Sequence, residues 1–324
     1  MAAPSESVPF SVNGKSALLT GAGSGITFCF ARLLLSKGCN VLIADIALRP
    51  EAQALVDEHS SKDGSKPRAI FVKTDVTIWS QLENAFNEAD THFGGLDILC
   101  PGAGVFEPHS SNFWVPPGNP KSKDPITGTQ AEGLGHYFTL DLNITHPIRA
   151  TQLAISRFLN PIEGSKSGKA SASNPKRIVH ISSIAGQTPG FATPLYIASK
   201  HAISGFIRSL AQLDSTLSIR VNGVAPGIIK TPLWTEHPEK LQMLNKEQDE
   251  WVEPEEVAEA LLRCVEDEGV GGGYVMEVLK GRTRNVEWRM DPGPQGPGGT
   301  ASERAAMAME VFGWLGEPGW GKTG

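Results

Sequence analysis

The sequence predicts an α/β fold: a doubly wound parallel sheet of seven strands with helices on both faces. Short runs of β-branched and aliphatic residues alternate with longer stretches whose apolar residues recur at helical spacing. Strands that alternate with helices are joined by right-handed crossovers, which makes the sheet parallel. The chain has 324 residues, a length that α/β proteins often fold around one continuous sheet. We therefore expect a single domain followed by a carboxyl-terminal tail.

Seven apolar runs are the expected strands. In chain order they are SALLT, NVLIAD, RAIFVKT, LDILC, RIVHIS, IRVNGVA and GYVMEVL. After the first run, GITFCFARLLLSKG has helical spacing of its apolar residues and ends in Lys-Gly, a typical helix stop. After the third run, TIWSQLENAFNEADTHFGG repeats this arrangement. Such helices are expected to cover the faces of the sheet.

The runs divide the chain into three parts. We expect residues 1–13 to be an amino-terminal extension, 14–281 the catalytic domain, and 282–324 a Pro/Gly-rich tail with one short helix in SERAAMAMEVFGWL. An insertion at 107–135, rich in Pro, Gly, Ser and Asn, follows the fourth strand at the edge where α/β sheets bind ligands. It either shapes a substrate entrance or is a solvated surface segment.

Composition excludes several classes of function. Asp and Glu number 35 against 29 Lys and Arg, without a basic block, so we expect no nucleic-acid partner. The chain lacks the roughly 18 uninterrupted apolar residues of a membrane span and a secretory start, so a cytoplasmic protein without a membrane partner is predicted. The four cysteines are far apart and form no CxxC pair. They are expected to be reduced thiols, and no metal site is expected.

A glycine-rich turn follows the first strand in LLTGAGSGIT, residues 18–27. Gly21 and Gly25 allow a tight turn and a close approach of the backbone to a pyrophosphate at a helix start. Asp45 ends the second strand, where a carboxylate accepts hydrogen bonds from ribose hydroxyls and repels a 2′-phosphate. The pattern predicts a dinucleotide cofactor and favours NAD. Arg49, just past that strand, keeps NADP as the alternative.

A second group of residues indicates chemistry. Ser183 ends a strand, Tyr196 follows in PLYIASK, and Lys200 comes one helical turn later on the same face. A phenol with a pKa of about 10 is a poor base, but a neighbouring ammonium and a cationic nicotinamide both favour the phenolate. Tyr196 would accept the proton of an alcohol as hydride leaves its carbon, while Ser183 holds the substrate oxygen. This predicts an oxidoreductase acting on a secondary alcohol or ketone.

These motifs resemble those of the short-chain dehydrogenase/reductase family, whose Rossmann-type fold binds NAD or NADP. The match covers residues 14–281, and YIASKHAISGFIRSLA, APGIIKTPL and EDEGVGGGYVMEVLKG are most similar to the NAD-dependent hydroxyprostaglandin dehydrogenase branch. The family pattern TGxxxGxG falls on Thr20, Gly21, Gly25 and Thr27, its catalytic tetrad on Asn143, Ser183, Tyr196 and Lys200, and its PG motif on Pro226 and Gly227.

The resemblance implies further roles. Asp75 would lie beside the adenine, Asn143 would hold a water that relays protons to Lys200, Lys200 would bind the nicotinamide ribose, and Thr231 would contact the nicotinamide or pyrophosphate. Residues 231–251 occupy the position of a lid. A homodimer or homotetramer would pack through the helices that carry Asn143 and Tyr196. The residues expected to bind cofactor are Gly21, Ser24, Gly25, Ile26, Asp45, Asp75, Val76, Ala103, Gly104, Tyr196, Lys200, Pro226, Gly227, Ile229 and Thr231.

Two departures from the family pattern keep other functions open. Thr27 replaces the last glycine of the turn, although its hydroxyl could donate to a phosphate. The family's NNAG is here PGAG, residues 101–104, which lacks two amides that brace the central strand. The alternatives are an NADPH-dependent ketone reductase of a biosynthetic pathway, and a non-catalytic or redox-neutral protein that binds dinucleotide. The complete tetrad argues against a non-catalytic protein and leaves the redox-neutral alternative open.

Overall fold

One twisted sheet organises the protein. The structure, a computed structural model, describes residues 9–61, 67–125, 135–235, 245, 250–287 and 304–320. The strand order is β3-β2-β1-β4-β5-β6-β7-β8, and neighbours from β3 to β7 run parallel. The chain therefore winds outward in both directions from β1 and β4, which confirms the predicted doubly wound α/β class. The strands are β1 (Ser16–Thr20), β2 (Asn40–Asp45), β3 (Ala69–Lys73), β4 (Ile98–Pro101), β5 (Lys176–Ile181), β6 (Ile219–Pro226), β7 (Val275–Leu279) and β8 (Arg282–Asn285).

The predicted count of seven strands was wrong by one. Strand β8 pairs antiparallel with β7 after the turn at Gly281, whose φ is +63°. Its four residues, RTRN, are all exposed and carry no apolar side chain, so no hydrophobic pattern marked them as a strand. Charged side chains on an edge strand discourage pairing with another sheet. The sheet thus continues to Asn285.

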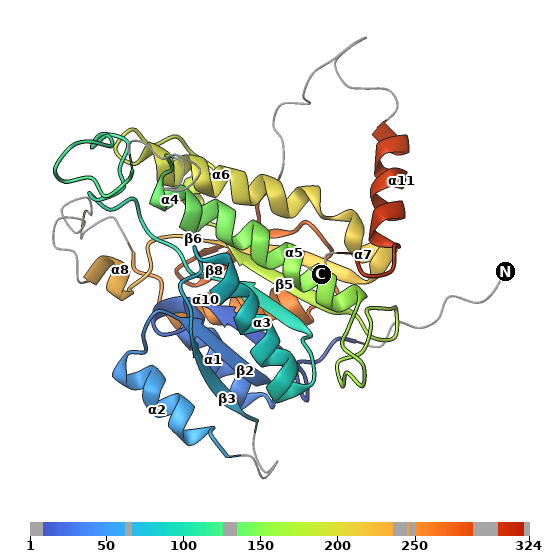
Figure 1. Cartoon of the computed structure of the whole chain (residues 1–324). Helices are drawn as coiled ribbons and strands as arrows, with labels where there is room; N and C mark the ends of the chain where they lie inside the picture. Colours follow the sequence, from blue (N-terminus) through green and yellow to red (C-terminus); the bar gives the residue numbers. More distant parts are fainter. Residues whose placement is uncertain are drawn as a thin grey trace.

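Helices cover both faces of the sheet. One face packs on α1 and α10, and the other on α3 and α5, with α6 beside α5 in Figure 1. None of the described helices is long and apolar enough to cross a membrane. The helical segments are α1 (Gly25–Ser36), α2 (Pro50–Glu58), α3 (Trp79–Phe93), α4 (Phe138–Leu140), the π-helix η1 (Asp141–Thr145), α5 (His146–Leu159), the 3₁₀ turn η2 (Ile184–Gly186), α6 (Pro194–Ser209), α7 (Gln212–Leu217), α8 (Pro232–Thr235), α10 (Pro254–Glu266) and α11 (Arg304–Leu315).

The strands alternate their side chains between the two cores. In β1, Ala17 and Leu19 belong to the cluster under α1 and α10, whereas Leu18 belongs to the cluster under α3 and α5. All three are fully buried. A parallel sheet covered on both faces needs such continuous apolar runs, which is why the sequence marked these strands clearly.

A buried ion pair joins strands at the end of the sheet opposite the glycine turn. Lys176, at the start of β5, donates from Nζ to Asp97 Oδ1 at 2.6 Å and to the Ser167 carbonyl oxygen at 2.6 Å. Asp97 Oδ2 accepts from the Ser16 amide at the start of β1. Burial lowers the pKa of Lys176, and the charge and hydrogen bond of Asp97 oppose that shift. Through Asp97, these contacts tie the start of β5 to the start of β1.

The tail contains the helix expected from its sequence. Helix α11 stands beside α7 in Figure 1, and Leu315 at its end is buried against the α3 and α5 cluster. The carbonyl oxygen of Trp320 accepts hydrogen bonds from Ser156 and Asn160 of the α5 end at 2.9 and 3.1 Å. The tail is therefore packed on the domain at this point.

Candidate active site

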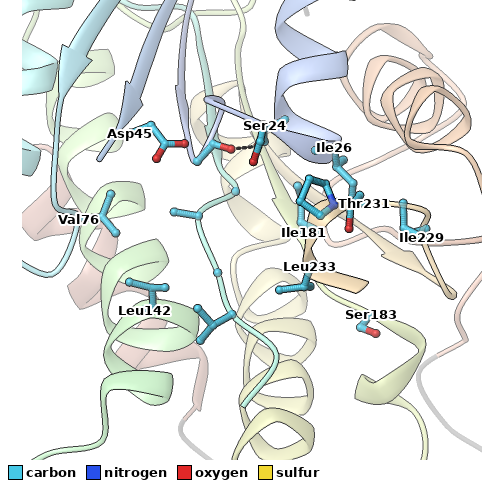
Figure 2. A pocket seen from close by; sticks show the side chains of 18 of the residues that line it. Ser24, Ile26, Asp45, Val76, Leu142, Ile181, Ser183, Ile229, Thr231 and Leu233 are labelled. Atoms are coloured by element: carbon cyan, nitrogen blue, oxygen red, sulfur yellow. Dashed lines mark hydrogen bonds between the residues drawn. The ribbon is translucent and has the colours of Figure 1, made fainter. Parts of the chain in front are cut away.

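A pocket of about 440 Å³ opens at the carboxyl ends of the parallel strands. It lies where the strand order reverses, which is the usual ligand position in doubly wound sheets. Figure 2 shows Asp45 and Val76 on one side, with Ser183 and Ile229 on the opposite side. The pocket brings together every residue expected to bind cofactor, namely Gly21, Ser24, Gly25, Ile26, Asp45, Asp75, Val76, Ala103, Gly104, Tyr196, Lys200, Pro226, Gly227, Ile229 and Thr231, and also Ser183.

The glycine turn connects β1 to α1 along one wall of the pocket. Gly21 and Gly25 have φ values of +70° and +63°, a region that other residues rarely adopt. A Cβ added at Gly21 would lie 2.6 Å from the Ala103 Cα. Asp45 braces the turn, because its Oδ2 accepts the Gly23 amide at 2.8 Å while Oδ1 accepts the Ile46 amide at 2.7 Å. The sequence analysis did not anticipate this bracing role.

Thr27 packs against Gly102, so the two departures from the family pattern are in contact. Thr27 is buried, and its hydroxyl donates to the Gly21 carbonyl oxygen at 2.5 Å. The Thr27 hydroxyl therefore uses its proton for a hydrogen bond within the turn. A Cβ at position 102 would lie only 2.2 Å from Thr27 Cγ2. Thr27 thus occupies the space that a side chain at position 102 would need. Because residue 102 is glycine, the threonine side chain fits there.

A histidine braces the central strand where the family amides are missing. The Ala103 amide donates to Thr20 Oγ1 at 3.2 Å, and Thr20 Oγ1 lies 3.0 Å from His146 Nε2. His146 Nδ1 lies 3.1 Å from the Leu142 carbonyl oxygen. These contacts are all satisfied if Nδ1 carries the proton, so that Thr20 donates to Nε2. Burial lowers the pKa of His146 to about 4, which keeps the imidazole neutral at pH 7.

A π-helix, η1, carries Asn143 and leaves a carbonyl oxygen as the acceptor for His146. The His146 amide donates to Asp141 O, five residues back. The next carbonyl, Leu142, would pair with residue 147, but that residue is proline and has no N–H. The Leu142 oxygen is thus left for the His146 ring. Single π-turns of this kind are frequent at functional sites.

Asn143 lies behind the pocket lining. Its Oδ1 accepts the Val105 amide at 2.9 Å, and its Nδ2 donates to the Val105 carbonyl oxygen at 2.9 Å and to Ser199 Oγ at 3.2 Å. Asn143 is buried, and a Cβ added at Gly104 would lie 3.0 Å from its Oδ1. Of the four tetrad residues, Asn143 therefore supports the wall, while the other three face the pocket.

Ser183, Tyr196 and Lys200 meet at the ends of β5 and α6. The Ser183 hydroxyl donates to the Pro226 carbonyl oxygen at 3.4 Å and accepts the Ala185 amide at 3.1 Å, and Ser183 and Tyr196 both line the pocket. Lys200 Nζ donates to the Ile181 carbonyl oxygen at 3.0 Å and lies 5.5 Å from the centre of the Tyr196 ring. Burial raises the pKa of Tyr196, which the Ser183 hydrogen bond opposes, and burial lowers the pKa of Lys200 to about 8. The arrangement can therefore exchange a proton at the Tyr196 hydroxyl, provided that positive charge favours the phenolate.

Several lining residues were missed by the sequence analysis. Phe138 and Leu142, from α4 and η1, and Val105 after β4 give the pocket an apolar wall. Leu142 directly precedes Asn143 in the sequence, and this position next to an expected site residue could have identified it as a lining residue. Of the expected lid at 231–251, Leu233 lines the pocket, whereas 236–244 and 246–249 lie outside the described residues, as do 126–134 of the insertion. Within the described ranges, no group of three metal-ligating side chains is found.

Comparisons with known proteins agree with this geometry. A family model described as short chain dehydrogenase matches residues 15–242. The rat (Rattus norvegicus) protein 15-hydroxyprostaglandin dehydrogenase, NAD(+), is 30% identical over 280 residues, covering 82% of this chain and 91% of that protein. The hydroxynaphthalene reductase-like protein Arp2 of Metarhizium robertsii (strain ARSEF 23 / ATCC MYA-3075) is 33% identical over 235 residues, covering 72% of this chain and 74% of its own.

Solved structures also share the fold. A 3-ketoacyl-(acyl-carrier-protein) reductase from Brucella melitensis, complexed with NADH, has a TM-score of 0.63 at 22% identity, covering 83% of this chain and 98% of that one. A short chain dehydrogenase from Burkholderia cenocepacia J2315, in complex with NADP, has a TM-score of 0.60 at 26% identity, with coverages of 83% and 98%. The neighbours thus include complexes of both nicotinamide cofactors.

The contact between Thr27 and Gly102 predicts strong coupling. Gly102→Ala should lower the free energy of unfolding by about 2 kcal/mol, because the added Cβ has no room beside Thr27 Cγ2. In the double variant, Thr27→Gly removes the closest clash, while Ile181 Cδ1 and Thr20 O stay 3.1 and 3.2 Å from the added Cβ. The two costs should therefore fall short of additivity by at least about 1 kcal/mol. Urea unfolding of the four proteins measures this coupling.

Gly205→Ala is the matched control, since an added Cβ there meets nothing within 4 Å. It should leave stability unchanged or raise it slightly, as alanine does inside a helix. Costs at 27 and 102 that simply add would contradict the account of a coupled pair.

The His146 brace predicts a pH dependence of stability. An unfolded histidine titrates near 6.5, while the folded pKa of His146 is about 4. As pH falls from 6.5 to 4, the unfolded chain gains a proton that the folded one does not, so stability is lost, by about 3 kcal/mol in total. Urea unfolding across this range should show His146→Gln losing less stability than the wild type on acidification. Parallel curves for the two proteins would show that His146 does not titrate in this way.

Proposed function

Because the chain belongs to the short-chain dehydrogenase/reductase family and is a nicotinamide-dependent oxidoreductase of alcohols and ketones, we propose that it oxidises a secondary alcohol with NAD, using Tyr196 as the general base. The family, the hydroxyprostaglandin dehydrogenase-like branch and the enzyme class predicted from the sequence are confirmed by the matches. The single observation that carries the proposed role of Tyr196 is that Tyr196 and Ser183 line the same pocket, with Lys200 Nζ 5.5 Å from the centre of the Tyr196 ring.

The carboxylate of Asp45 supports NAD over NADP. It ends β2 at the pocket and is held by two backbone amides, so its charge has a fixed position. A 2′-phosphate placed against a fixed carboxylate is repelled, whereas ribose hydroxyls can donate to it. Among the described residues that line the pocket, Lys200 is the one cationic side chain, and it lies at the Tyr196 end. The name of the rat relative also specifies NAD(+).

The residues fit the proposed chemistry as follows. The nicotinamide, when bound, accepts hydride from the substrate carbon. Ser183 holds the substrate oxygen, and Tyr196 takes the hydroxyl proton. The Lys200 ammonium, anchored on Ile181 O, favours the phenolate and is available to the nicotinamide ribose. Asn143 holds Val105 in the pocket wall through two hydrogen bonds. We also propose that Asn143 holds a water molecule that relays protons to Lys200.

The proposed cofactor cradle surrounds these groups. The pyrophosphate would lie along the turn that contains Gly21, Ser24, Gly25 and Ile26. Thr231 lies beside this turn, because its Cγ2 would be 3.6 Å from a Cβ added at Gly25. Opposite the turn, Asp75 and Val76 would flank the adenine. The remaining proposed contacts are Ala103, Gly104, Pro226, Gly227 and Ile229.

The substrate is proposed to be apolar around its carbinol carbon. Val105, Phe138, Leu142 and Leu233 line the pocket, and such side chains favour burial of hydrocarbon. We propose residues 14–281 as the catalytic domain, working in the cytoplasm, where the four buried cysteines stay reduced thiols. A homodimer or homotetramer is proposed from the family resemblance.

A ketone reductase that uses NADPH is the second candidate. Arg49, the N-cap residue directly before α2, follows Asp45 by four positions, and its amide donates to the Gly23 carbonyl oxygen at 3.2 Å. A guanidinium so near the turn is the type of group that accommodates a 2′-phosphate. The same Tyr196 hydroxyl would then donate its proton to a ketone.

Replacing Tyr196 by Phe tests the proposed function. Phe keeps the ring but lacks the hydroxyl that exchanges the proton, so kcat for alcohol oxidation should fall by about 10²–10⁴. NADH binding, followed by nicotinamide fluorescence, should change little. The measurement is NADH formation over a panel of secondary alcohols. Tyr274→Phe, remote from the pocket lining, is the control and should keep wild-type kcat. Full turnover by Tyr196→Phe would eliminate the proposed mechanism.

A further inference from the structure

Helix α6 carries Tyr196 and Lys200 but lacks a cap of its own. Its first residue is Pro194, and among the described contacts Thr193, at the cap position, contributes no side-chain hydrogen bond. The first N–H groups of a helix have no partners within it. The Ile197 amide donates to Thr193 O at 3.0 Å, and proline has no N–H. The amides of Leu195 and Tyr196 therefore need acceptors from elsewhere in the chain.

Glu107, 89 residues earlier in the chain, supplies the acceptor for Tyr196. Its Oε2 accepts the Tyr196 amide at 2.9 Å. Its Oε1 accepts the Phe113 amide at 3.0 Å. The residue is 5% exposed. Burial raises the pKa of Glu107, and hydrogen bonds from backbone amides oppose that rise. A carboxylate at a helix start is also favoured by the helix dipole.

The two residues before Glu107 contact the same machinery. Val105 exchanges two hydrogen bonds with Asn143. The Phe106 ring meets the Tyr196 ring edge-on, with centroids 4.7 Å apart and planes at 72°. Three consecutive residues thus hold Asn143, the Tyr196 ring and the Tyr196 amide.

The backbone at Glu107 adopts an unfavourable conformation to make this possible. Its φ is +28°, a value rarely found for residues other than glycine. Such conformations persist where surrounding contacts over-determine them, and they cluster at functional sites. The contacts here are the Phe113 and Tyr196 amides, which the carboxylate accepts. The strained segment and the start of α6 are therefore held together as one unit.

We propose that Glu107 is a positioning residue for hydride transfer: its carboxylate fixes the main chain of Tyr196 while Phe106 fixes the ring, so that the phenol stays aimed at Ser183. This inference rests on the proposed role of Tyr196. Glu107 acts through Tyr196 and need not touch the substrate. A displacement of a reacting group by about 1 Å can cost about 100-fold in rate, so a fixed main chain matters here. The 107–135 insertion thereby contributes its first residue to the site.

The kinetic test separates positioning from simple helix stabilisation. Glu107→Ala removes the hydrogen bonds from the Phe113 and Tyr196 amides, and we expect kcat for the alcohol that the wild type oxidises to fall by about 30-fold or more. The Kd for NADH should change less than threefold, because the cofactor-binding turn is untouched. Glu107→Gln keeps one acceptor oxygen and should recover most of kcat.

Glu256→Ala is the matched control. Glu256 also accepts two backbone amides, from Glu253 at the start of α10 and from Gly281, at 3.2 and 2.9 Å, but it lies outside the pocket lining. Its loss should lower the melting temperature and leave kcat within twofold of the wild type.

A spectroscopic readout does not depend on turnover. The chain has three tyrosines, so ring-labelled protein gives three sets of NMR signals, and Tyr196→Phe assigns one of them. In Glu107→Ala the Tyr196 signal should shift or broaden, while those of Tyr137 and Tyr274 stay in place. Should the Glu107→Ala protein fail to fold, judged by circular dichroism, the Gln variant is measured instead, and the same change in smaller degree is expected.

The outcomes are distinct. An unchanged Tyr196 signal, or kcat within threefold of the wild type in a folded Glu107→Ala protein, overturns the positioning role. Equal losses of kcat in the Glu107 and Glu256 variants overturn it too, because they would reflect stability alone. A wild-type protein that oxidises no alcohol defeats the proposed function, and the NMR comparison still decides whether Glu107 positions Tyr196.

Discussion

The hydrogen-bonded path from the Ala103 amide through Thr20 to His146 is the contact on which the pocket depends. It joins the end of β1, the loop after β4 and the start of α5. A proline at 147 and the π-turn before it free the Leu142 oxygen that orients the imidazole. A neutral, fully buried histidine can accept from one side and donate on the other. It thereby links the PGAG segment at Ala103 to the start of α5.

Burial works against the charges that the proposed chemistry requires. It raises the pKa of Tyr196 and lowers that of Lys200, so neither phenolate nor ammonium is favoured by the protein interior alone. The Ser183 hydrogen bond and the Ile181 carbonyl offset part of this cost. In a dry site, a cationic nicotinamide would have a large effect on the phenol. In the proposed mechanism, proton transfer from the substrate to Tyr196 would thus be linked to the presence of oxidised cofactor.

Much of the fold and pocket could be predicted because the informative patterns are local. Apolar runs marked the parallel strands, and motif spacing placed the pocket-lining residues at the carboxyl ends. Strand β8 was missed because RTRN has no apolar face. The capping of α6 by Glu107 joins residues far apart in sequence, and no periodicity reveals such a contact. The fit of Thr27 against Gly102 likewise depends on distances between loops.

The most direct measurement is a fluorescence titration of the purified protein with NADH and, separately, with NADPH. If the Thr27 turn and the His146 brace preserve the cradle, NADH should bind saturably. NADPH should bind at least about tenfold more weakly, because a fixed Asp45 carboxylate repels the 2′-phosphate, a difference of about 1.4 kcal/mol or more. Binding of neither cofactor would contradict the account, since a closed turn could not support hydride transfer. Equal or tighter binding of NADPH would contradict the role proposed for Asp45.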